Sequence, residues 1–73
     1  MARSEVEIHP VQNTRGEVTV VDIEARGGNR RERGAAIAAA VRAYGKPLKR
    51  VRISYSETYG FLHASYARYT IEG

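Results

Sequence analysis

Arginines at one position in the chain have the type and spacing to bind phosphate. Arg30, Arg31 and Arg33 directly follow Gly27-Gly28-Asn29, where the sequence predicts the start of a helix. Guanidinium groups hold phosphate oxygens through paired hydrogen bonds, and the first N–H groups of a helix attract anions. We therefore predict a phosphate-contacting segment here. The alternative is an ordinary strand-to-helix loop that needs its glycines in order to turn.

Aromatic residues provide a second type of chemistry in the C-terminal third of the chain. Tyrosine and phenylalanine rings stack on nucleic-acid bases, and here they are interleaved with basic residues. The residues that we predict to contact nucleic acid are Arg30, Arg31, Arg33, Lys49, Arg50, Arg52, Tyr59, Phe61, Tyr66 and Tyr69. The alternative is that the tyrosines close the core and rim of a small sheet, because tyrosine is favoured in strands.

Residues for catalysis or metal binding are sparse. The chain has no cysteine, and His9 and His63 are its only histidines. A zinc site needs three or four well-placed ligands, which no spacing here supplies. A pair formed by either histidine with Asp22 or Glu24 is geometrically conceivable. We predict no catalytic residue, no metal and no cofactor, and we do not expect an enzyme.

Charge is distributed unevenly along the sequence. The formal net charge is +4, and residues 26–52 carry nine basic side chains against Glu32 alone. The segments on either side are slightly acidic. A basic middle segment indicates a site for a polyanion. The alternative is internal pairing, in which acidic strands neutralise basic strands across a sheet.

One helix must position the first group of arginines, and its two ends are marked. Asn29 is a favourable N-cap, and Glu32 stands where its carboxylate can reach back to the cap. Gly45 stands where a left-handed residue ends a helix, and Pro47 prevents its continuation. The sequence predicts a helix over residues 30–44.

The predicted helix has two different faces. Ile37, Val41 and Tyr44 share one side with Ala40 and Gly34, and this side is expected to pack on a sheet. Close approach of helix and strand would explain a glycine in the helix interior. The far side carries Arg31, and Ala35, Ala39 and Arg42 form a predicted interface on it. A solvated helix face, a helix–helix dimer contact and a phosphate-facing surface remain open for this side.

Alternating apolar residues predict four strands, at about 3–11, 17–26, 48–56 and 61–72. The alternation slips at Val20–Val21, which indicates a β-bulge or burial on both faces. Arg50, Arg52 and Ser54 are expected to share one face of the third strand. The resulting fold is a single α+β domain of order ββαββ, with an antiparallel sheet of two hairpins packed on one helix.

A chain of 73 residues buries a limited core, so we expect a homo-oligomer, with a dimer favoured. No apolar run is long enough to span a bilayer, and we predict a cytoplasmic protein with no membrane partner. The predicted function is binding of DNA or RNA through the Arg-rich helix start and an Arg/Tyr sheet face. The alternative is a protein-interaction module, a small regulator or inhibitor of phage or plasmid type. It would dock on an acidic partner by a sheet edge or by the Ala/Arg helix face.

Overall fold

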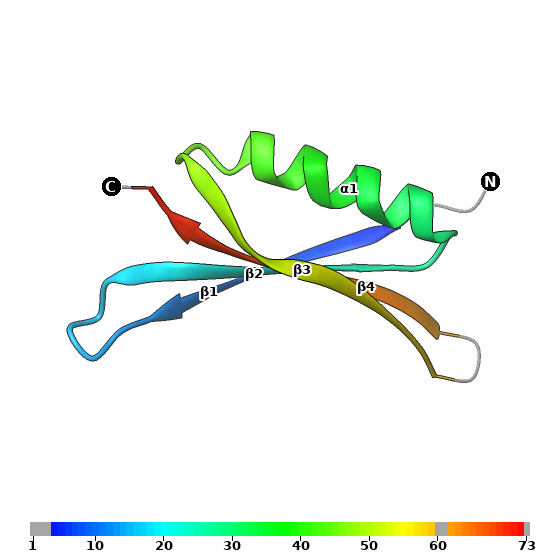
Figure 1. The fold of residues 1–73 in the computed structure, drawn as a ribbon, viewed down its shortest axis with the longest axis horizontal. Coiled ribbons are helices and arrows are strands. Elements are labelled where there is room, and N and C mark those ends of the chain that lie inside the picture. The colour runs from blue at the N-terminus through cyan, green and yellow to red at the C-terminus, as the bar shows by residue number, and fades with distance from the viewer. Residues whose placement is uncertain (1–3, 60–61, 73) are drawn as a thin grey trace.

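The chain folds into one antiparallel sheet with one helix packed on it (Figure 1). A computed structural model describes residues 4–59 and 62–72, and of residues 52–59 and 62 it describes the backbone only. The elements are β1 (Glu5–Gln12), β2 (Val18–Arg26), α1 (Arg30–Ala43), β3 (Leu48–Tyr59) and β4 (Leu62–Ile71). The predicted α+β class and the order ββαββ are confirmed.

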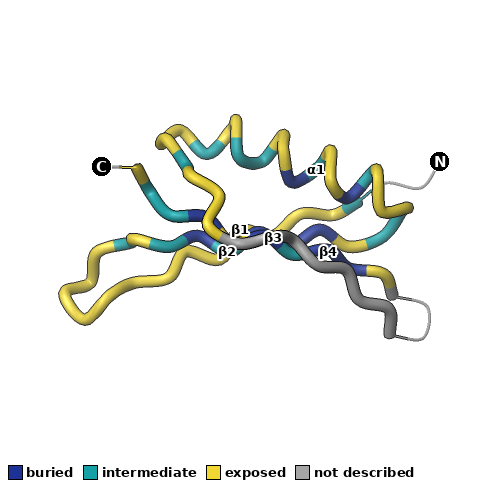
Figure 2. The backbone as a smooth tube through the Cα atoms, in the orientation of Figure 1, coloured by how far each residue is buried: buried dark blue, intermediate teal, exposed yellow. Residues whose placement is uncertain are grey.

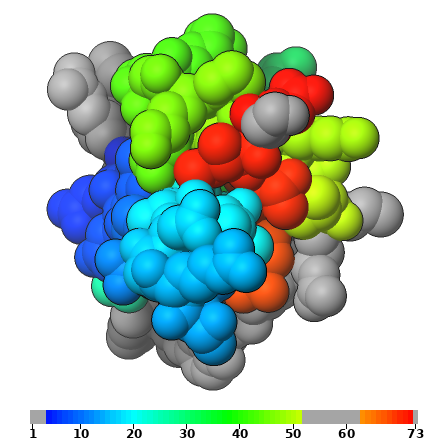
Figure 3. Space-filling view, turned by 90° about the vertical axis from the view of Figure 1, so that its left-hand side faces the viewer, coloured from blue at the N-terminus to red at the C-terminus, as the bar shows by residue number. Residues whose placement is uncertain are grey.

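The two hairpins meet in the middle of the sheet, whose strand order is β1-β2-β4-β3. The second strand of each hairpin lies in the centre, and the first strand lies at an edge. The space-filling view from one end shows this order from blue through cyan and red to yellow, with the helix above (Figure 3). Strand β2 pairs with β4 from Val20 opposite Thr70 to Arg26 opposite Ala64.

The helix begins and ends as the sequence predicts. The Asn29 side chain accepts a hydrogen bond from the Glu32 N–H at 2.8 Å, and the Glu32 carboxylate accepts one from the Asn29 N–H at 2.9 Å. These two bonds form a capping box, which satisfies N–H groups that the first turn leaves open. Tyr44 is the C-cap, and Gly45 follows with φ of +88°, a left-handed conformation that glycine adopts without strain.

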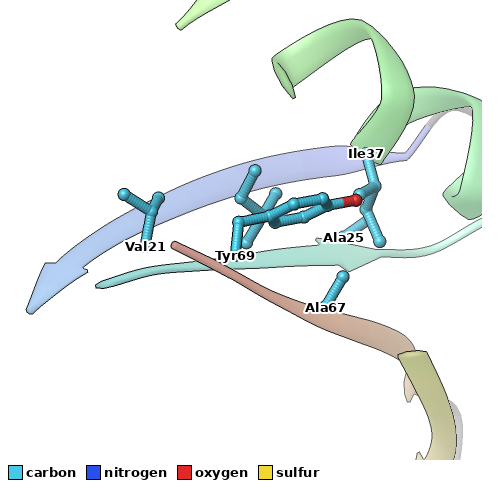
Figure 4. Close-up of a cluster of buried hydrophobic side chains, with 6 residues drawn as sticks. Val21, Ala25, Ile37, Ala67 and Tyr69 are labelled. Atoms are coloured by element: carbon cyan, nitrogen blue, oxygen red, sulfur yellow. The ribbon is translucent and has the colours of Figure 1, made fainter. Parts of the chain in front are cut away.

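The hydrophobic core lies between the helix and the two central strands (Figure 4). Alternate residues of β2 point at the helix, and their partners on β4 do the same. The core residues are Val21, Ile23 and Ala25 of β2, Ala67 and Tyr69 of β4, and Ile37 of α1. Val41 and Tyr44 pack at its margin as predicted. Several core residues have small side chains, so the apolar area that they bury, and hence the stability gained from it, is limited.

The helix covers only part of the sheet. The molecule measures 40 × 22 × 17 Å, whereas a helix of this length spans about 21 Å. Burial is concentrated beneath the helix, and the β1–β2 hairpin extends beyond it as an exposed arm (Figure 2). The opposite face of the sheet is covered by no helix within residues 4–59 and 62–72. No helix in that part of the chain is long and apolar enough to cross a membrane.

The alternation predicted for the third strand is interrupted. Register shifts fall between Arg50 and Arg52 and between Arg52 and Tyr55. Arg50 therefore pairs with Tyr69, and Arg52 pairs with Arg68, although these two partners are consecutive on β4 and belong to opposite faces. The shifts break the two-residue period of the backbone. That Arg50, Arg52 and Ser54 share a face stays a prediction, because the side chains of Arg52 and Ser54 lie outside the described residues.

Two smaller predictions also need correction. The irregularity of β2 is at Thr19, because Val11 pairs with Val20 and Gln12 pairs with Val18. Gly34 is exposed, and a Cβ added there would meet no atom within 4 Å. Close packing on the sheet therefore does not explain this glycine.

Candidate nucleic-acid interface

The solvent side of α1 is a flat basic surface, which we call the basic helix face. It consists of Arg31, Ala35, Ala38, Ala39 and Arg42, all of them exposed. Spacings of four, seven, eight and eleven residues from Arg31 place these side chains along one side of a helix. The two arginines lie about 16 Å apart along the axis. Alanines between them let a ligand approach the helix closely.

No acidic side chain neutralises this surface within the described residues. Glu32 is the sole acidic residue of α1, and its carboxylate is held in the capping box. No ion pair involves Arg31 or Arg42 in the part of the chain that the structure describes. Arg30 at the helix start is also exposed. The predicted interface residues Ala35, Ala39 and Arg42 thus lie together on an accessible, positively charged surface.

Basic residues continue beyond the end of the helix. Lys46, Lys49 and Arg50 are all exposed, in the turn after α1 and at the start of β3. In Figure 1 this turn adjoins the C-terminal end of the helix, whose last turn contains Arg42. Lys49 pairs with Thr70 and so points to the sheet face away from the helix. Arg50 instead pairs with the core residue Tyr69 on the helix side. Lys46 and Arg50 therefore add positive charge on the helix side of the sheet.

The helix start is less open to an external anion than its sequence indicates. The Glu32 carboxylate and the Asn29 side chain occupy N–H groups of the cap. Gly27 and Gly28 have φ values of +83° and +69°, so the turn itself requires glycine. The alternative of an ordinary strand-to-helix loop accounts for this segment.

Arg33 is not available to nucleic acid at the predicted site, because its side chain points inward. Its relative exposure is 5 %. The Nε atom donates to the Ser65 hydroxyl at 2.8 Å, and one terminal nitrogen donates to the Gly28 carbonyl at 2.7 Å. Its position four residues before Ile37 placed it in the buried stripe, and that spacing was the sequence signal for this role.

Tyr69 is also unavailable for base stacking. Its ring belongs to the core, and its relative exposure is 9 %. The alternative that the tyrosines close the core holds for this residue. Tyr66 is half-buried on the opposite face, where its hydroxyl hydrogen bonds with Glu24. Phe61 and the side chains of Arg52 and Tyr59 lie outside the described residues.

The sheet face opposite the helix, which we call the uncovered sheet face, neutralises its own charges. It carries Glu7, His9, Asp22, Glu24, Arg26, Tyr66 and Arg68. Arg68 donates from Nε and a terminal nitrogen to the two Asp22 oxygens, at 2.7 and 2.8 Å. Arg26 forms a similar forked pair with Glu24, at 2.8 and 3.3 Å. The internal pairing that the sequence left open is therefore observed on this face.

Glu24 is the centre of a hydrogen-bonded cluster and is buried, with a relative exposure of 7 %. The Arg26 guanidinium is the main reason why its pKa is lowered from the ordinary value of 4.5, and the Tyr66 and His9 contacts act in the same direction. Burial opposes this effect, because it penalises the charged form. Glu24 also raises the pKa of Arg26. The pair is thus charged at neutral pH.

One group of side chains on the uncovered sheet face has metal-ligand chemistry. The His9 Nε2 atom lies 3.3 Å from a Glu7 oxygen and 3.5 Å from a Glu24 oxygen. The three ligand atoms lie within 4.8 Å of one another. The Arg26 guanidinium already holds both Glu24 oxygens and would oppose a cation there. The His9–Glu24 pair that the sequence makes conceivable is accordingly formed as a close contact between the two side chains.

Comparison of the chain with family models, curated proteins and solved structures finds no match. The class that the observations define is a small α+β domain with one basic helix surface and one self-neutralised sheet surface.

Proposed function

We propose that this protein binds nucleic acid through contacts between the basic helix face and phosphate groups. The observation that carries the proposal is the exposure of Arg31 and Arg42 on a surface of alanines without a neutralising carboxylate in the described residues. Arg30 at the start of α1, and Lys46 and Arg50 beyond its end, extend the positive field on the helix side. Such contacts supply affinity without reading the base sequence.

The proposal differs from the sequence hypothesis in the surface that it uses. The sequence favoured the helix start together with an Arg/Tyr sheet face, whereas Arg26 and Arg68 on that face are paired with carboxylates. The main contacts are therefore expected on the helix. Stacking by Tyr59 or Phe61 stays a prediction, and so do a cytoplasmic location and the absence of catalysis.

The test measures fluorescence anisotropy of labelled single-stranded and duplex oligonucleotides at about 50 and 200 mM salt. The double variant Arg31→Gln/Arg42→Gln is expected to lower the affinity about a hundredfold at the lower salt. The reason is that each lost phosphate contact removes about one counterion released on binding. For duplex DNA, the negative slope of log affinity against log salt concentration should become less steep by about two.

The matched control is Arg15→Gln, an exposed arginine in the turn between β1 and β2, far from the helix. It removes one positive charge and should change the affinity less than threefold on the same assay. An equal loss for Arg15→Gln and for Arg31→Gln alone would show that only net charge matters. Absence of binding by the unmodified chain at the lower salt would refute the proposal.

A second candidate function is protein interaction, and the exposed edge strand β1 favours it. All eight residues of β1 are exposed, and an unpaired strand edge accepts a further strand. The basic helix face would then attract an acidic partner. A pull-down in which Arg31→Gln/Arg42→Gln loses a protein partner, together with no anisotropy change on nucleic acid, would favour this function over the first.

A further inference from the structure

The outer edge of β1 is unusually apolar for an exposed edge strand. Val6, Ile8 and Val11 have relative exposures of 36, 38 and 40 %. Within the described side chains, Val51 is the one other large hydrophobic residue that is comparably exposed. Edge strands that must stay single are normally protected by charges, prolines or covering segments. This edge carries Glu5, Glu7 and Pro10. It also presents Val6 and Ile8 on the helix side of the sheet and Val11 on the other side.

Pro10 fixes the direction in which the backbone groups of β1 point. It pairs with Val21, and proline has no N–H, so this position cannot exchange hydrogen bonds with β2. Hydrogen-bonded and non-hydrogen-bonded pairs alternate along an antiparallel ladder. Glu7 and His9 therefore bond to β2, whereas the N–H and C=O groups of Val6 and Ile8 point away from the sheet.

We propose that a second copy of this chain pairs with this edge, antiparallel, with Ile8 opposite Ile8 of the second copy. The two Ile8 residues then exchange backbone hydrogen bonds across the two-fold axis. The Val6 N–H group donates a hydrogen bond to the Pro10 carbonyl of the second copy. This bond does not require an N–H group on the proline. Pro10 thus removes one donor from the edge and leaves those of Val6 and Ile8 in place.

Charge complementarity selects this register. With Ile8 at the axis, Glu7 lies directly opposite His9 of the second copy on the uncovered sheet face, and His9 lies opposite Glu7. A register centred on Glu7 would place two carboxylates opposite each other, which destabilises a strand pair. A register centred on His9 would place two imidazoles opposite each other. The Ile8-centred arrangement places a glutamate opposite a histidine at both positions and sets no two carboxylates opposite each other.

The pairing also extends the apolar layer. Val6, Ile8 and Pro10 share the helix side of β1 with the core residues of β2, and directly opposed residues point to the same face. The two sheets join into one continuous sheet, and the two helices lie on the same side of it. The basic helix faces of both copies are then presented together.

Single cysteines test the register directly, because the chain has none of its own. Opposed residues of a hydrogen-bonded pair have Cα atoms about 5.5 Å apart, within reach of a disulfide. Ile8→Cys should therefore cross-link to itself under mild oxidation at least tenfold faster than Glu7→Cys or Val6→Cys. Arg15→Cys, in the exposed turn after β1, measures the rate of random collision. Faster cross-linking of Glu7→Cys than of Ile8→Cys would overturn the register.

Sedimentation equilibrium of the unmodified chain tests the association itself and involves no cysteine. The weight-average mass should rise toward that of a dimer with concentration. Ile8→Pro removes the outward N–H group and the apolar side chain of residue 8 but no hydrogen bond to β2. It should therefore keep its circular dichroism spectrum and weaken the dimer at least about tenfold. Val51→Ser, an exposed apolar residue on the other edge strand, should not weaken it.

A monomer mass at all concentrations for the unmodified chain would overturn the proposal. Equal weakening by Val51→Ser and Ile8→Pro would also overturn it, because the contact would then not be specific to β1. None of these measurements contains nucleic acid. The failure of this inference is therefore distinguishable from the failure of the proposed function.

Discussion

The basic helix face and the uncovered sheet face both expose arginines, but the two surfaces treat them differently. Arg31 and Arg42 lie on a helix whose one acidic residue, Glu32, closes the N-terminal cap. On the sheet, Arg68 lies directly opposite Asp22 in the register and forms a forked pair with it. Equal charge in the sequence therefore becomes unequal electrostatic potential at the surface.

The difference shows that secondary structure decides which charges meet. Neighbouring strands set side chains of distant segments directly opposite each other, so an acidic strand neutralises a basic one. On a helix side that faces solvent, the neighbours of a side chain are three and four residues away, and none of these neighbours of Arg31 and Arg42 is acidic. A count of basic residues therefore overstates the charge on the sheet face, and it describes only the solvent side of the helix correctly, because Arg33 points inward.

The largest effect on stability is expected for Arg33, which belongs to the same helix as Arg31 but faces inward. Comparing these two arginines separates a buried arginine from one on the basic helix face. Arg33→Gln should lower the free energy of unfolding by about 2 kcal/mol, since it removes hydrogen bonds from buried Ser65 and from the Gly28 carbonyl. Arg31→Gln should change it by less than about 0.5 kcal/mol. Urea denaturation measures both.

The binding assay should give the reverse order, with Arg31→Gln weakening nucleic-acid binding more than Arg33→Gln at a temperature where both are folded. If Arg33→Gln were as stable as the unmodified chain, the buried hydrogen bonds would not be contributing to stability. The inward orientation of Arg33 would then have to be revised.

Acid provides a second test of the contrast between the two surfaces, because it should break the neutrality of the uncovered sheet face. The pKa of Glu24 is lowered in the folded protein by Arg26, so the ionised carboxylate stabilises the fold above its ordinary pKa of 4.5. That contribution is lost as the pH falls below 4.5 and through the lowered pKa. Thermal denaturation between pH 3 and 7 should show it, on the order of one proton taken up on unfolding.

Glu24→Gln is the variant that isolates this contribution. Its melting temperature should depend less on pH below 4.5 than that of the unmodified chain, because the titrating group is absent. Glu17→Gln, an exposed acidic residue in the turn before β2, serves as the matched control. An identical pH dependence for Glu24→Gln and the unmodified chain would assign the acid sensitivity to other carboxylates.

Substitution of Gly34 should have a smaller effect on the free energy of unfolding than substitution of Arg33, and this effect should be stabilising. Gly34 lies exposed in the interior of α1, with open space where a Cβ would be. Gly34→Ala should raise the free energy of unfolding by up to about 1 kcal/mol, since alanine favours the helix. The variant leaves the charge of the basic helix face unchanged, so nucleic-acid affinity should stay within twofold. A loss of stability in chemical denaturation would mean that the glycine has a packing role.

Local features of this fold were predictable from the sequence. The Asn29–Glu32 capping box and the end of the helix at Gly45 depend on residues a few positions apart, and the structure confirms them. The inward stripe of Ile37, Val41 and Tyr44 follows from the helical period. The prediction for Arg33 was wrong, because this residue belongs to the same inward stripe, where its charge is satisfied by buried hydrogen bonds.

Non-local features were not predictable from the sequence. The Asp22–Arg68 pair joins residues that meet only because β2 lies beside β4, and one sequence does not specify that strand order. The register shifts in β3 are a second such feature, because they arise only in its pairing with β4. The apolar edge of β1 was readable as a pattern of Val6 and Ile8, but its exposure depends on where the helix ends over the sheet.

The central position of the β2–β4 pairing also determines how the chain can reach this structure. Each hairpin joins strands adjacent in the chain and can close within microseconds, whereas β2 and β4 are separated by the helix and by β3. The core takes Ile23 from one half of the chain and Ala67 and Tyr69 from the other. Neither half can bury its apolar residues alone, and the entropy of closing the long loop must be met before that burial occurs. We therefore expect the meeting of the two hairpins to be the step that limits folding of this chain.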